Sequence, residues 1–175
     1  MKNKTVVVAL VVALSGWSCG DGGGEITGEA GLQSVMQAIA LDLAAVLDEI
    51  APSDIVPALK GAGNTADCND GGTANWLGAS QGTLTFADCT LRGITLNGSL
   101  VGFLSSEFGN LSANGLQGFL MISGGATADL NVQRLIVSAS LPITDAGTFW
   151  EIEAITEENE LICAWSGGGP CQSFF

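Results

Sequence analysis

The sequence contains no histidine and no tyrosine, and only five of its 175 residues are lysine or arginine. The absence of histidine removes the side chain that most often transfers protons near neutral pH and that most often binds transition metals. It also removes the usual base that activates a serine or threonine nucleophile. Nucleic-acid binding depends on clustered basic residues, which this chain lacks. The composition therefore argues against a nucleic-acid partner and against the common hydrolytic mechanisms.

Acidic residues are abundant by comparison, and eighteen Asp and Glu give a net charge of −13 at pH 7. Removal of an N-terminal leader carrying Lys2 and Lys4 would leave three basic residues against the same eighteen acidic ones, a net charge of −15. Such a body is repelled by an anionic bilayer surface. Its charge favours solubility and does not point to a particular ligand.

Charged residues nevertheless make up only 13% of the chain, whereas 47% of the residues are hydrophobic and 25 are glycine. This composition argues against a disordered chain, which is rich in charge and poor in apolar residues. It favours a β-rich fold with many tight turns. The length is that of one domain.

The first 18 residues have the three parts of a secretory signal peptide. Lys2 and Lys4 give a positively charged start, an unbroken apolar run of nine residues covers 6–14, and small residues follow. The run is shorter than the roughly 20 residues that a transmembrane helix needs. We therefore expect residues 1–18 to be a signal peptide and the protein to be exported.

The segment Gly16-Trp17-Ser18-Cys19 follows the apolar run and resembles the lipobox of bacterial secreted lipoproteins. Ser18 matches the small residue that directly precedes the cysteine of that motif. Trp17 stands where the motif has another small residue, and Gly16 stands where it has leucine. The resemblance is confined to this N-terminal part. It implies that Cys19 is lipidated and anchors the protein in the bacterial cell envelope, at the outer membrane or the periplasmic face. Cleavage after Ser18 without lipidation, which gives a secreted protein, is the alternative.

Glycine dominates the residues after Cys19, and such a segment is flexible and does not pack. We therefore interpret residues 19–28 as the lipidated Cys and a Gly-rich tether. Residues 29–175 are expected to form a single β-rich domain.

Apolar residues recur at helical spacing from about residue 28 to residue 50, and Pro52 is expected to end this amphipathic helix. Packing of its apolar face on a sheet is the expected arrangement. The alternative is a helix that covers an apolar cavity. The residues that would line such a cavity are Leu32, Met36, Ile39 and Leu43.

The rest of the chain alternates apolar and small polar residues, as strands do. Leu84 and Phe86 are predicted to point to one face, with Thr83 and Thr85 on the other. Asn97-Gly98 is either a two-residue turn or a bulge in a long strand. Residues 61–72 are expected to form a loop. Further strands are predicted at 116–122, 130–141, 148–155 and 161–165.

Short connections between these segments predict antiparallel pairing. The predicted fold is therefore α+β and mostly β. It is an antiparallel meander or partly closed barrel of about seven to eight strands, with one N-terminal amphipathic helix packed on it.

Four cysteines remain when Cys19 is set aside, and they allow three disulfide pairings. Neighbours in the sequence favour Cys68 with Cys89 and Cys163 with Cys171, in an oxidising compartment. A zinc site is disfavoured because the chain has no histidine and no C-x-x-C spacing. No metal and no cofactor is expected.

Three weaker patterns in the sequence each have an ordinary structural explanation. Asp67-Cys68-Asn69-Asp70 resembles the start of a calcium loop, but the later ligand positions do not match, so a turn is expected. Glu151 and Glu153 share one strand face, and three more glutamates follow close by; paired carboxylates can hydrolyse a glycosidic bond, but alternate acids on a strand are more often its solvated side. Tryptophans stack on sugars or fill cores. The residues concerned are Glu151, Glu153, Glu157, Glu158 and Glu160, with Trp76, Trp150 and Trp165.

We expect a non-catalytic envelope lipoprotein with a binding or structural role, attached to the membrane through its N-terminal lipid. A carrier of lipid or another apolar ligand is the first alternative, and a carboxylate-based glycoside hydrolase is the second. Its partners would be the membrane and either an apolar ligand or an envelope protein, with no nucleic acid.

Overall fold

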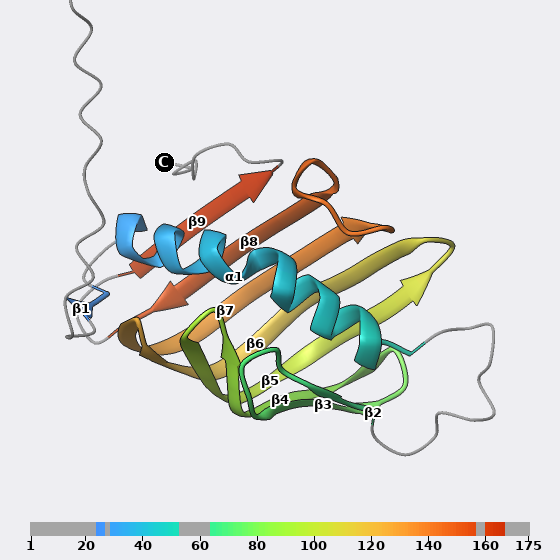
Figure 1. Cartoon of the computed structure of the whole chain (residues 1–175), viewed down its shortest axis with the longest axis horizontal. Coiled ribbons are helices and arrows are strands. Elements are labelled where there is room, and N and C mark those ends of the chain that lie inside the picture. The colour runs from blue at the N-terminus through green and yellow to red at the C-terminus, as the bar shows by residue number, and fades with distance from the viewer. Residues whose placement is uncertain (1–23, 27–28, 53–63, 157–159, 167–175) are drawn as a thin grey trace, which may run out of the picture.

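One long helix lies across one face of a single curled antiparallel sheet (Figure 1). The computed structural model describes residues 24–26, 29–52, 64–156 and 160–166. The elements in chain order are β1 (Gly24–Glu25), α1 (Glu29–Ile50), β2 (Asn64–Asp67), β3 (Thr73–Gly78), β4 (Gln81–Leu91), β5 (Ile94–Glu107), β6 (Asn110–Gly124), β7 (Ala126–Ser140), the 3-10 helix η1 (Asp145–Gly147), β8 (Thr148–Ile155) and β9 (Glu160–Ser166).

Each strand from β2 to β9 pairs with the next one along the chain, so the sheet is a meander with β2 and β9 at its edges. All these pairings are antiparallel, as expected for short connections. The α+β, mostly-β prediction is confirmed, in its open form. The short strand β1 is the exception, because it pairs in parallel with the start of β7, Gly24 opposite Ala126.

The helix α1 begins and ends where its apolar periodicity predicts, and it contacts every strand from β2 to β9. Within the described residues it is long and apolar enough to cross a membrane by length and composition, with half of that stretch buried inside the protein. The burial shows that its apolar face is used by the fold. The residues on this face are Leu32, Val35, Met36, Ile39, Ala40, Leu43, Ala44, Val46, Leu47 and Ile50.

The inner face of the sheet forms the other half of the core. Leu84 and Phe86 are buried while Thr83 and Thr85 are not, so the predicted alternation of β4 is confirmed. Trp76 and Trp150 are each 1% exposed and belong to this core. The outer face of the sheet, away from α1, carries mostly small polar side chains.

Two glycines allow the long central strands to coil around α1. Gly98 and Gly118 have φ of 140° and 147°, a conformation that residues with a Cβ rarely adopt. A Cβ at Gly98 would lie 2.2 Å from the Phe119 carbonyl oxygen, and one at Gly118 would lie 2.3 Å from that of Ser99. Glycine inside a strand permits this close approach and a sharper bend.

Asn97-Gly98 lies inside β5, so the turn alternative is wrong and the strand continues through it. The irregularity is in β4, where Phe86 pairs with Gly98 and Cys89 with Leu96, which leaves two β4 residues opposite Asn97. This is a β-bulge.

The prediction of a loop over residues 61–72 is wrong for residues 64–67, which form the edge strand β2. Ala66 is 2% exposed there, and the Asn64 amide donates a hydrogen bond to the Ile50 carbonyl at 2.9 Å. With only one apolar residue, the segment has no strand pattern of its own. Its pairing with β3 and its contact with the end of α1 determine its conformation.

Candidate functional site

The predicted disulfide between Cys68 and Cys89 is present, and both residues are buried, at 5% and 0% exposure. It ties the β2–β3 turn to β4. Cys163 lies in β9, where its backbone is opposite Ile152. Cys19 and Cys171 lie outside the described residues, so the lipidation of Cys19 and the second disulfide remain predictions.

The four residues proposed to line an apolar cavity, Leu32, Met36, Ile39 and Leu43, are between 0% and 3% exposed. They belong to one continuous hydrophobic core that α1 shares with the sheet. The arrangement is that of a packed helix, and the carrier hypothesis gains no support from it.

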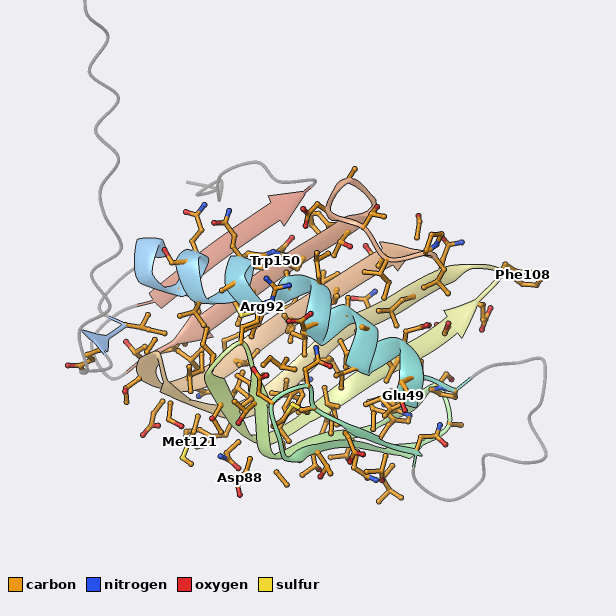
Figure 2. All side chains as sticks on the ribbon, in the orientation of Figure 1. Glu49, Asp88, Arg92, Phe108, Met121 and Trp150 are labelled. Carbon is orange, nitrogen blue, oxygen red and sulfur yellow. A yellow bond between two sulfur atoms is a disulfide. The ribbon has the colours of Figure 1, made fainter. Side chains whose placement is uncertain are left out.

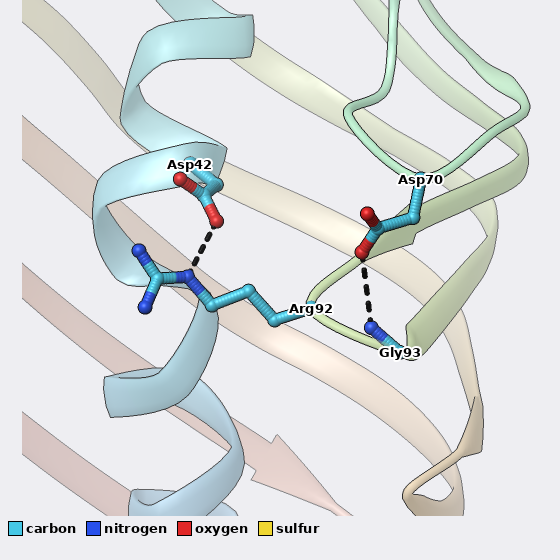
Figure 3. A network of polar contacts seen from close by, with 4 residues as sticks. All are labelled: Asp42, Asp70, Arg92 and Gly93. Atoms are coloured by element: carbon cyan, nitrogen blue, oxygen red, sulfur yellow. Dashed lines mark hydrogen bonds and ion pairs between the residues drawn. The ribbon is translucent and has the colours of Figure 1, made fainter.

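The calcium-like segment forms the turn between β2 and β3. The Cys68 N–H donates to the Gly72 carbonyl at 3.0 Å. The Asp70 carboxylate accepts from the Gly93 N–H at 3.1 Å, as Figure 3 shows. In the part of the chain that the structure describes, no group of three or more acidic, cysteine or histidine residues could hold a metal ion. The Asp70 carboxylate thus joins two neighbouring turns.

The β4–β5 turn also reaches the helix. Arg92 Nε donates to Asp42 Oδ2 of α1 at 2.6 Å (Figure 3). This hydrogen bond, with the charge of the Asp42 carboxylate, raises the pKa of Arg92 above its usual value. The guanidinium is therefore engaged on the helix side of the sheet.

The carboxylates considered for hydrolysis lie side by side on the outer face of β8. Arg134 of β7 forms an ion pair with Glu151 through Nη2, and its Nε is 3.7 Å from Glu153 Oε2. Glycosidases place two carboxylates on either side of the scissile bond. Here both share one guanidinium on one strand face, so the geometry adds no support for hydrolysis. Glu160 begins β9, while Glu157 and Glu158 lie outside the described residues.

Sequence reasoning missed a group of apolar side chains on the outer face. Val101 and Phe103 of β5 and Phe119 and Met121 of β6 are 49%, 53%, 48% and 42% exposed. We call these four residues the outer stripe. Val101 pairs with Gln117, which places Phe119 diagonally across from it, within reach of side-chain contact. The four side chains therefore form one diagonal row across two strands, with polar residues directly opposite each of them.

A signal for the outer stripe exists in the sequence. In residues 100–104 and 119–122, the side chains expected on both faces of the strand are apolar, except for one glycine. An antiparallel strand with one solvated face alternates apolar and polar residues instead. Only the pairing register shows that the two runs lie next to each other.

Acidic residues flank the Met121 end of the outer stripe. Asp129 of β7 is directly opposite Met121 on one side, and Asn97 of β5 on the other. Asn97 Oδ1 accepts from the Asp88 N–H at 2.8 Å, and its Nδ2 donates to Asp88 Oδ1 at 3.0 Å. Figure 2 shows Met121 and Asp88 projecting past the lower rim of the curled sheet, away from α1.

A third exposed phenylalanine lies at the end of the molecule opposite β1. Phe108, at the tip of the β5–β6 hairpin, is 91% exposed, with φ of 47° (Figure 2). It is separate from the outer stripe and provides a control for it.

Comparisons with known proteins give no relative on which to base an assignment. No protein-family model matches the chain, no curated protein matches it, and no solved structure matches it.

Proposed function

We propose that this protein is a non-catalytic lipoprotein of the bacterial cell envelope, anchored through Cys19, that works by binding through the outer face of its sheet. The observation that carries the proposal is the asymmetry of the sheet. One face packs on α1, whereas the other bears the exposed apolar outer stripe on its central strands. A contiguous exposed apolar patch is typical of an interaction site.

The buried disulfide supports the exported location. Disulfides form and persist in oxidising compartments and are rare in the cytosol. The Cys68–Cys89 bond thus agrees with a leader that directs the chain out of the cytosol.

The experiment is production of the full chain in a bacterium, followed by intact mass measurement and membrane flotation. We expect a mature protein that begins at Cys19, carries the mass of acyl chains and floats with membranes. Cys19→Ser should lose both the added mass and the flotation, whereas Cys163→Ser should keep both. An unmodified mature protein in the soluble fraction would contradict anchoring. A cytoplasmic protein that retains Met1 would contradict export.

A further inference from the structure

We propose that the outer stripe is the docking site for a protein partner that presents an apolar strip flanked by lysine or arginine. This inference rests on the binding role proposed above and adds the chemistry of the partner.

The stripe lies on interior strands, so a partner docks on their side chains. β5 is hydrogen-bonded to β4 and β6, and β6 to β5 and β7. Addition of a strand requires a free sheet edge, which these strands do not offer. Val101, Phe103, Phe119 and Met121 stand on this hydrogen-bonded platform, each about half exposed. A rigid platform loses little entropy when it is covered.

The charges on this face favour a cationic partner. Asp88 and Asp129 flank the Met121 end of the stripe. The basic residues in the described part of the chain are Arg92 and Arg134. Arg134 is paired with two glutamates, and Arg92 is bonded to α1 on the opposite face. Neither arginine of the described residues pairs with these two aspartates, and Asp88 Oδ1 accepts only from the neutral Asn97 amide, so both can attract a lysine or arginine from outside.

The same charges disfavour two other occupants. A second copy of this chain would bring its own acidic residues against these, and like charges facing each other in an interface are costly. An anionic bilayer repels the body for the same reason. Electrostatic complementarity thus selects a protein surface with basic residues beside apolar ones.

The test uses two labelled, end-blocked ten-residue peptides, one alternating Leu with Lys and the other Leu with Glu. Each is titrated against the exported mature protein, and binding is followed by fluorescence anisotropy. We expect the Lys peptide to bind at least tenfold more tightly than the Glu peptide. The Val101→Ser, Phe119→Ser double variant should lose at least tenfold, and Phe103→Ser alone should weaken binding in the same direction.

Matched controls separate the outer stripe from general stickiness and from general acidity. Phe108→Ser removes a more exposed aromatic at the hairpin tip and should change binding less than twofold (Figure 2). Asp129→Asn should weaken the Lys peptide two- to threefold, whereas Glu49→Gln on the exposed side of α1 should not. Circular dichroism checks that each variant keeps the fold.

Three results would each overturn the proposal. They are no binding of the Lys peptide, equal binding of the two peptides, and a loss in Phe108→Ser as large as in the double variant. Sedimentation that shows self-association abolished by the double variant would also overturn it, in favour of a second copy. The peptide titration does not depend on acyl chains, so its outcome is independent of whether Cys19 anchors the protein.

Discussion

Replacement of Ile39 by alanine distinguishes a packed helix from a helix that covers a ligand cavity. Ile39 is fully buried in the core between α1 and the sheet. The change removes three carbon atoms, which corresponds to about 2.4 kcal/mol of transfer free energy at about 0.8 kcal/mol each. The cavity left behind adds to this, so we expect the free energy of unfolding to fall by about 3 to 4 kcal/mol.

Urea denaturation of the full chain, followed by circular dichroism, measures this loss. For a body of this size the melting temperature should fall by about 10 °C. Glu49→Ala is the matched control on the same helix, because Glu49 is exposed and its replacement should change the free energy by less than about 0.5 kcal/mol.

A loss below about 1 kcal/mol for Ile39→Ala would refute the reasoning, because a side chain that lines a cavity has few packing partners to lose. Native mass spectrometry gives the second measurement. A lipid that co-purifies with the unaltered protein and is lost in Ile39→Ala would favour the carrier hypothesis.

Three further predictions concern the frame of the sheet. Replacing Cys68 and Cys89 by alanine should lower the free energy of unfolding by about 3 kcal/mol in urea, because it releases a loop with a sequence separation of 21; a change under 1 kcal/mol would argue against this. Gly118→Ala should lower the free energy of unfolding by more than about 1 kcal/mol in the same assay. Gly125→Ala should not, because its Cβ would meet nothing closer than 3.7 Å. Arg134→Met should lower the free energy of unfolding by less than about 1 kcal/mol, and the loss should shrink in 1 M salt, since the Arg134 side chain is half exposed.

Local patterns in the sequence predict the parts of this fold that depend on neighbours along the chain. The 22-residue helix follows from apolar spacing, and the buried side of β4 follows from simple alternation. The Cys68–Cys89 bond follows from proximity in the sequence together with an oxidising compartment.

The parts that were missed depend on residues distant in sequence. β2 has no apolar alternation. It forms because it pairs with β3 and is hydrogen-bonded to the end of α1. β1 pairs with a strand that begins about a hundred residues later. The outer stripe requires the register that brings Val101 diagonally to Phe119, and composition gives no register.

The pairing of β1 with β7 limits how far the folded body can move from an anchored Cys19. The chain is part of the sheet from Gly24, and Ile26 is buried. A free tether that starts at Cys19 therefore cannot extend to residue 28, as the sequence predicted, and ends before Gly24. Five residue steps separate Cys19 from Gly24, which span at most about 18 Å. The β1 end of the sheet would therefore sit near the lipid headgroups. Phe108, beyond the 14-residue strand β5, would point tens of ångströms outward.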